Sequence, residues 1–159
     1  MTKFKMGEQS AKTTKKSQTN TYGELILGLP GDSMESHSQS LRDLVNMGLS
    51  IIRMYQLILL PQTAMNTMES REKYEMKTLY RLMPRSYGRY ILYDETLTAI
   101  EYEEICIANN TMPFEDYLVC RRFSLIIESF THSVFAPMVR LITEDLNISV
   151  YDFVKGFGI

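Results

Sequence analysis

Tyr22 to Asp32 read YGELILGLPGD, and this stretch decides how the rest of the chain is interpreted. A short apolar run, Leu25 to Leu27, is followed by a Gly-Leu-Pro-Gly turn, and Ser33 stands where it can cap a helix. A buried strand, a glycine turn and a capped helix are the parts of one β-α unit. Ligands of α/β sheets bind where strands end and loops begin, so the turn is the first candidate site.

The turn itself favours two interpretations. Gly28 and Gly31 allow backbone conformations that other residues avoid, and Pro30 stiffens the segment between them. Amide groups at the start of the following helix would favour an oxygen-rich or anionic ligand. No Gly-Lys-Ser/Thr follows, so the turn is not a phosphate-binding P-loop. A purely structural loop is the other interpretation.

A second strand is predicted beyond the first helix. The helix covers residues 34–47 and ends at Gly48, with His37 on its polar, exposed side. Residues 49–60, LSIIRMYQLILL, form a β-rich run that Pro61 stops. Strand, helix and strand in this order predict a βαβ unit with parallel strands. The first strand lacks strict alternation, which predicts cover on both of its faces. The turn at 61–63 then follows the same, carboxyl, end of the sheet.

The remainder predicts a small α+β subdomain with two or three strands and two or three helices. A polar helix is expected at 64–77, and short strands at 78–83, 89–93 and 99–108, antiparallel where the turns are short. Helices are expected at 111–130, 134–146 and 149–154. The acidic run Glu101, Glu103 and Glu104 is interpreted as a solvated strand face, with Glu103 or Glu104 paired to Arg85 or Arg89.

Composition excludes several classes of protein. The chain has 159 residues, 45% of them hydrophobic and 23% charged, which suits one globular domain. The net charge of −2 predicts no general field for polyanions, so no nucleic-acid partner is expected. No apolar run is long enough for a membrane helix, and the amino-terminal lysines precede no apolar signal core. We therefore expect no membrane span and a cytoplasmic location.

Two further expectations concern the amino-terminal segment and the cysteines. Residues 1–21 are basic and polar, with too little apolar surface to offset the entropy of ordering, and are expected to form a disordered tail. Cys106 and Cys120 form no CxxC pair, and we expect buried free thiols. Neither catalytic nor metal-ligating residues can be assigned from the pattern.

Several segments in order resemble the radical S-adenosylmethionine (radical SAM) superfamily. Residues 21–63 are similar to the carboxyl-terminal part of a radical SAM barrel, where a strand ends in a Gly-Leu-Pro-Gly-Glu-Thr-like turn. Residues 71–90, 100–130 and 147–155 are similar to the carboxyl-terminal extension of the branch that carries a cobalamin (B12)-binding domain. The resemblance implies late barrel βα units at 22–77 and an α+β extension at 78–159, an α/β fold with an incomplete TIM-like barrel.

The resemblance also implies a site. An apolar side chain at Ile26 would pack on the adenine of S-adenosylmethionine, the backbone near Gly28 would lie close to it, and Leu57 would add apolar contact. The implied cofactor-binding set is Ile26, Gly28, Leu29, Pro30, Gly31 and Leu57. The full-length parent would use S-adenosylmethionine, a [4Fe–4S] cluster and cobalamin, which supply the chemistry.

The chain departs from the family in ways that limit its activity. The Cys-x3-Cys-x2-Cys loop that holds the cluster is missing, and two cysteines cannot build a three-thiolate site. Gln62 stands where the family prefers glycine. We expect a carboxyl-terminal fragment that is inactive alone, binds S-adenosylmethionine weakly or not at all, holds neither of the other two cofactors by itself, and has the missing barrel half and cobalamin domain as partners. The alternative is a non-catalytic interaction module whose carboxyl-terminal helices offer an apolar groove near Phe123, Ile127 and Phe135.

Overall fold

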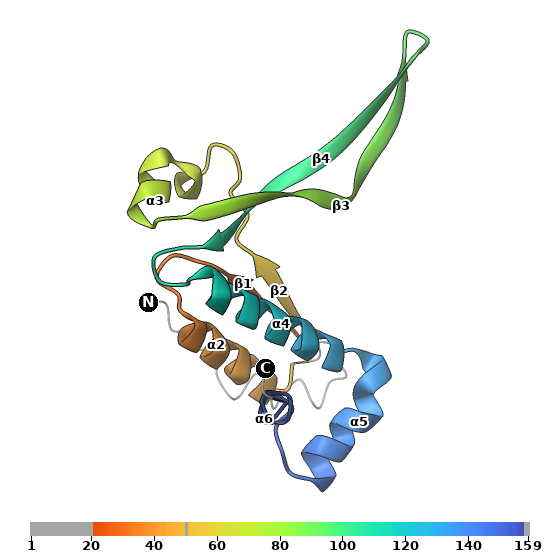
Figure 1. Ribbon diagram of the computed structural model, residues 1–159. Coiled ribbons are helices and arrows are strands. Elements are labelled where there is room, and N and C mark those ends of the chain that lie inside the picture. Colours follow the sequence, from red (N-terminus) through yellow and green to blue (C-terminus); the bar gives the residue numbers. More distant parts are fainter. Residues whose placement is uncertain (1–20, 50, 158–159) are drawn as a thin grey trace.

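A computed structural model describes residues 21–49 and 51–157, and it is a mixed α/β protein (Figure 1). The predicted tail, residues 1–21, falls almost entirely outside these ranges. The helices are α2 (Met34–Asn46), α3 (Met68–Lys73), α4 (Phe114–Phe130), α5 (Ala136–Arg140) and α6 (Val150–Lys155). The strands are β1 (Tyr22–Leu27), β2 (Ile51–Gln56), β3 (Lys77–Leu92) and β4 (Glu95–Ala108). They form two two-stranded sheets, β1–β2 and β3–β4.

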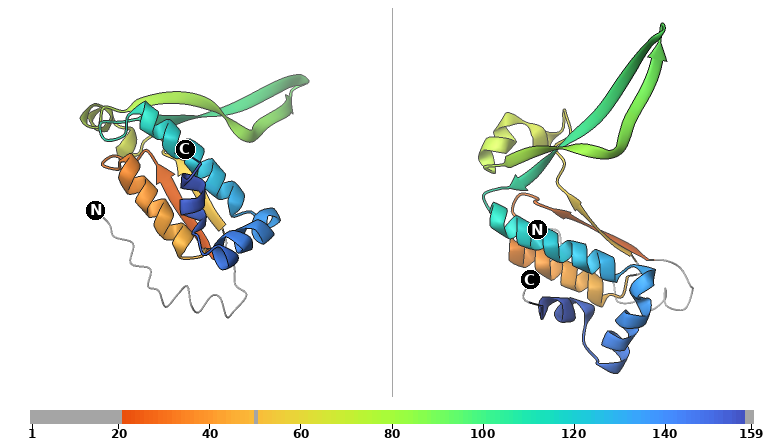
Figure 2. Two further views of the ribbon diagram at one scale, coloured as in Figure 1. Left: turned by 60° about the horizontal axis from the view of Figure 1, so that its bottom comes forward. Right: turned by 45° about the vertical axis from the view of Figure 1, so that its right-hand side comes forward.

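The β1–β2 sheet is parallel, which confirms the predicted βαβ unit. Its register runs from Tyr22 opposite Ile51 to Leu27 opposite Gln56, with α2 as the crossover. Helices α2 and α4 lie side by side over one face of the sheet (Figure 2). The expectation of cover on both faces is wrong. Side chains on the other face, including Ile26 and Tyr55, are exposed because no described segment packs there.

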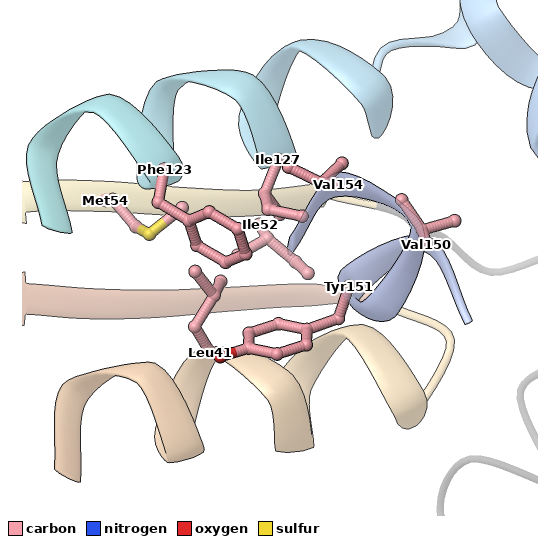
Figure 3. Packing of buried hydrophobic residues seen from close by; sticks show 8 residues of the cluster. All are labelled: Leu41, Ile52, Met54, Phe123, Ile127, Val150, Tyr151 and Val154. Atoms are coloured by element: carbon pink, nitrogen blue, oxygen red, sulfur yellow. The ribbon is translucent and has the colours of Figure 1, made fainter. Parts of the chain in front are cut away.

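The main core lies between the sheet and its three covering helices (Figure 3). Its buried members come from α2, β2, α4 and α6: Leu41, Ile52, Met54, Phe123, Ile127, Val150, Tyr151 and Val154. Residues 22–77 and 78–159 thus contribute to one core. Of the three residues expected to line a groove, Phe123 and Ile127 are buried, and the ring of Phe123 packs edge-on against Tyr151 with centroids 5.0 Å apart, whereas Phe135 is 39% exposed.

Helix α6 is held against α2 by polar as well as apolar contacts. Arg42 donates to both carboxylate oxygens of Asp152, at 2.9 and 3.1 Å, and its guanidinium lies 5.5 Å from the centre of the Tyr151 ring. Ser149 caps α6 by accepting from the amide of Asp152 at 3.0 Å. These contacts therefore hold the short helix α6 against the core.

Strands β3 and β4 form one long antiparallel hairpin that projects away from the helical layer (Figure 1). Two or three strands were predicted here, and two antiparallel strands are present. The predicted runs 78–83 and 89–93 are joined in β3, because the segment 82–87 is an irregularity inside that strand and not a loop. The reversal falls at Tyr93 and Asp94, both with positive φ. At the base, Leu59 donates to Glu104 and Cys106 donates to Leu57, each at 2.9 Å, so the hairpin is attached just beyond β2.

Two predicted helices are shorter than expected. Residues 64–77 form a 3-10 turn at Ala64–Asn66 and the single short helix α3, after which β3 begins. Residues 134–146 divide into a 3-10 turn at Ser133–Phe135, helix α5 and a π-helical turn at Leu141–Asp145. The predicted helices at 34–47, 111–130 and 149–154 are confirmed to within a few residues.

Candidate functional site

The glycine turn lies at the carboxyl end of β1, as the sequence predicts. Gly28 and Gly31 have φ of +89° and +81°, values that L side chains rarely adopt, which explains why glycine stands at both positions. The amide of Asp32 donates to the carbonyl of Leu29 at 3.1 Å and closes the turn. Ser33 caps α2, and its side chain accepts from the amide of Ser36 in a capping box.

The turn is held in place by Asn109, which lies in the segment before α4 and was not among the predicted site residues. Its side-chain amide donates to the carbonyl of Gly28 at 3.0 Å, while its side-chain oxygen accepts from the amides of Thr111 and Met112 at 2.9 and 3.0 Å. Asn109 is buried, so these hydrogen bonds satisfy a polar group that would otherwise be costly to bury. The only local signal is a polar Asn-Asn-Thr segment before the α4 proline, typical of a turn.

Carboxylates already occupy the start of α2. Burial would raise the pKa of Asp32, but hydrogen bonds from His37 and Ser36 outweigh it and lower that pKa below its usual value. The backbone amide and the Ser33 hydroxyl likewise lower the pKa of Glu35. Both groups are therefore ionised near neutral pH, and they oppose the anionic ligand that the turn alone suggested.

His37 differs from its prediction. It was expected on the exposed side of α2, but it is 2% exposed and its Nδ1 lies 3.6 Å from a carboxylate oxygen of Asp32. The reason is helical spacing: His37 precedes Leu41 by four residues and shares its buried face. Its Nε2 has no hydrogen-bond partner among the described residues.

The six predicted cofactor-binding residues fall into three groups. Ile26 and Leu29 are exposed, and Ile26 lies opposite Tyr55 on the uncovered face of the sheet. Gly28 and Leu57 are covered instead: a methyl group added to Gly28 would lie 4.0 Å from Cβ of Leu57 and 3.5 Å from the carbonyl oxygen of Cys106. Pro30 and Gly31 form the outer side of the turn. The structure thus brings Gly28 and Leu57 together, under the base of the hairpin.

The uncovered sheet face carries polar groups beside Ile26. The hydroxyls of Tyr22 and Tyr55 lie 3.2 Å apart, and Tyr22 donates to Glu24 at 2.7 Å. Arg53, from the same face, pairs with Glu128. The face is therefore mixed, with an apolar centre and hydroxyl, carboxylate and guanidinium groups around it, which suits a ligand with both apolar and polar parts.

The acidic run on β4 forms ion pairs, but with other partners than predicted. Glu103 pairs with Arg81, and Glu104 pairs with Arg71 at 2.6 Å, so Arg85 and Arg89 are not used. The hydrogen bond from Arg71 lowers the pKa of Glu104 to about 2, against burial. These two ion pairs tie the base of the hairpin together and engage the carboxylates of Glu103 and Glu104, whereas Glu101 lies exposed further along β4.

Both cysteines are buried and free, as predicted. Cys106 packs with Leu57 and Leu59, whereas Cys120 belongs to a separate cluster around Leu27. Burial raises the pKa of Cys120 to about 11. Within residues 21–49 and 51–157 no three His, Cys, Asp or Glu side chains are grouped to hold a metal ion. In the same residues no helix has the length and apolar character needed to cross a bilayer.

A cavity of about 510 Å³ lies at the other end of the layer, next to the start of β2. Its walls come from the carboxyl ends of α2 and α4 and from the segment before α6, and they include Ile52, Phe130 and Val139. None of the predicted cofactor-binding residues lines it. The cavity and the glycine turn are therefore separate features.

No family model matches the chain, and no curated protein matches it. The fold therefore defines the class only as a mixed α/β protein built on a parallel βαβ unit.

Proposed function

We propose that this chain is the carboxyl-terminal portion of a radical SAM enzyme of the B12-binding branch and contributes part of its adenine-binding wall. The observation that carries the proposal is the uncovered face of the parallel sheet. Ile26 is exposed there beside Tyr55, immediately before the glycine turn at the carboxyl ends of the strands. Two parallel strands with helices on one face, and with no segment of residues 21–49 and 51–157 on the other, are what a part of a barrel wall would look like. A cytoplasmic location belongs to the same proposal.

The charges near the turn support S-adenosylmethionine over a phosphate ligand. Asp32 and Glu35 both have lowered pKa values and are ionised near neutral pH. S-adenosylmethionine carries a positive sulfonium, which these carboxylates would attract, whereas they would repel a phosphate. Ile26 and Leu29 would supply the flat apolar contact for adenine. Gly28 would not, because its carbonyl already accepts from Asn109.

The cysteines do not fit the iron–sulfur cluster. A [4Fe–4S] site in this superfamily needs three thiolates, and the chain has two cysteines, buried in separate clusters. No residue can be assigned to cobalamin. The proposal therefore includes no chemical step on this chain alone, and it assigns the chain only a binding surface that another polypeptide would complete.

The test is a titration of the full chain with S-adenosylmethionine, monitored by the NMR signals of ¹³C-labelled isoleucine and leucine methyl groups. We expect weak, millimolar binding with shifts confined to Ile26 and Leu29, and smaller shifts with neutral S-adenosylhomocysteine. Ile26→Asn should abolish these shifts, whereas Ile91→Asn, an equally polar change on the hairpin, should leave them unchanged. Shifts that instead report the cavity residue Ile52, or an absence of shifts at 10 mM ligand, would refute the binding site.

Anaerobic reconstitution with iron and sulfide tests the second half of the proposal. The chain should retain no more iron than a variant with Cys106 and Cys120 replaced by serine. Stoichiometric cluster binding by the isolated chain would overturn the assignment of an incomplete enzyme.

A further inference from the structure

The β3–β4 hairpin has one face that is apolar and exposed along most of its length. Paired residues on antiparallel strands point to the same face, so the register assigns Tyr87 with Ile100, and Leu82 with Tyr102, to one side. The rings of Tyr80 and Tyr102 confirm this assignment, since their centroids lie 5.7 Å apart. We call this side the tyrosine face, defined by Tyr80, Leu82, Tyr87, Ile91, Ile100 and Tyr102, each 58–80% exposed.

The opposite side of the hairpin is different. It carries the ion pair of Arg81 with Glu103, and Tyr90 lies across Gly88, where an added methyl group would meet the Tyr90 ring at 2.5 Å. Its large apolar side chains are Leu79, Tyr90, Leu92 and Leu97, which are 51–56% exposed, less than those of the tyrosine face. A two-stranded hairpin is marginal by itself in water, so the uncovered tyrosine face needs a partner surface more than any other part of the hairpin.

The exposed area matches what a stable dimer needs. The six side chains of the tyrosine face expose the equivalent of about four whole residues, which at roughly 200 Å² each is on the order of 800 Å². A standard protein interface buries about 800 Å² on each partner. Two copies of this face, packed as two sheets about 10 Å apart, would reach that size without help from the rest of the molecule.

Few charged groups share the tyrosine face. Arg81 and Glu103 pair on the opposite side, and Glu104 is already bound by Arg71. The register places Arg89 beside Tyr87 and Ile91, so the apolar area and not a charge pattern carries the association.

We propose that the chain forms a symmetric dimer through the tyrosine faces of two hairpins. The interface is isologous and closes on itself, so it produces a dimer and not a fibre. It stands on the hairpin alone and is independent of the proposed role in S-adenosylmethionine binding.

Sedimentation of the full chain from 1 to 100 μM tests the association. We expect a dimer that dissociates at least 10-fold more readily when Ile91→Glu places a charge in the tyrosine face. The matched control is Leu97→Glu, the same change on the opposite side of the same hairpin, which should leave the dimer intact. A monomer at 100 μM, or equal loss of the dimer in both variants, would overturn the proposal. Open-ended oligomers would also overturn it, because they indicate pairing at the strand edges.

Discussion

Replacing Gly28 with alanine should separate backbone strain from crowding in the glycine turn. Gly28 has φ of +89°, a conformation that costs an L side chain about 1–2 kcal/mol. Crowding should add little, because the nearest atoms to an added methyl group are a carbonyl oxygen at 3.5 Å and a Cβ at 4.0 Å, both ordinary contacts. We therefore expect Gly28→Ala to lower the free energy of unfolding by about 1–2 kcal/mol, or about 3–6 °C in melting temperature.

Two other glycines serve as matched controls. Gly31 has φ of +81° and no atom within 4 Å of an added methyl group, so Gly31→Ala should cost a similar amount from strain alone. Gly23 does not have a left-handed backbone conformation, and a methyl group added to it would meet the end of the flexible Leu49 side chain at 2.5 Å. Gly23→Ala should therefore change stability by less than about 1 kcal/mol, because Leu49 can turn aside.

Urea unfolding, followed by far-ultraviolet circular dichroism, gives the three free energies from one linear extrapolation. If Gly28→Ala is as stable as the parent chain, the left-handed turn is refuted. If it costs more than about 3 kcal/mol while Gly31→Ala costs about 1, the contact with the base of the hairpin is tighter than described, and the crowding argument fails.

Three further predictions concern the hairpin base and the core. Arg71 lowers the pKa of Glu104 to about 2 in the folded state, so the stability that this ion pair provides is present above the ordinary carboxyl pKa of 4.5 and is lost as the pH falls toward 2. Between pH 7 and pH 3, the free energy of unfolding measured in urea should therefore fall by about 1–2 kcal/mol less in Glu104→Gln than in the parent chain, a range that allows for Arg71 being a quarter exposed. Ile127→Ala should cost about 2–5 kcal/mol, since Ile127 is fully buried, whereas the exposed Leu125→Ala should cost less than about 1, and equal losses in the two would contradict the described face of α4. Cys120 should react with a thiol reagent at pH 8 at least about 100-fold more slowly in the folded than in the unfolded chain, because burial raises its pKa to about 11, and fast labelling of the folded chain would show that α4 does not cover it.

The parts of the fold that sequence could predict are those with strong local signals. The strand, glycine turn and Ser33 cap lie within a dozen residues, and each depends on its own neighbours. The run Leu25 to Leu27 therefore located β1, and the helix predicted at 34–47 is nearly α2. The hairpin was divided wrongly because Pro84 and Gly88 usually mark turns. In the structure the long pairing with β4 carries β3 through both residues, with an irregularity between 82 and 87. Such pairing is non-local and has no signature in β3 itself.

The candidate site shows the same limit. The turn was selected correctly from its glycines, but its main support, Asn109, follows Gly28 by 81 residues and could be found only from the fold. His37 was within reach of the sequence, because its spacing of four from Leu41 already places it on the buried face of α2. The polar character of the His37 side chain predicted exposure, but its place on the helix determines that it is buried.

The two exposed surfaces of this molecule differ in chemistry, and the difference indicates what each should bind. The uncovered sheet face places Ile26 among polar groups: the paired hydroxyls of Tyr22 and Tyr55 and the Arg53–Glu128 ion pair. Side chains that already satisfy one another in this way gain little from an apolar protein surface, but they can exchange partners with a small polar ligand. The tyrosine face has large side chains and almost no such pairs, so its gain comes from removing apolar area from water. A small ligand cannot cover 800 Å², whereas a second hairpin can. The sheet face therefore suits a ligand and the hairpin suits a protein, and the titration and the sedimentation experiment test these two assignments independently.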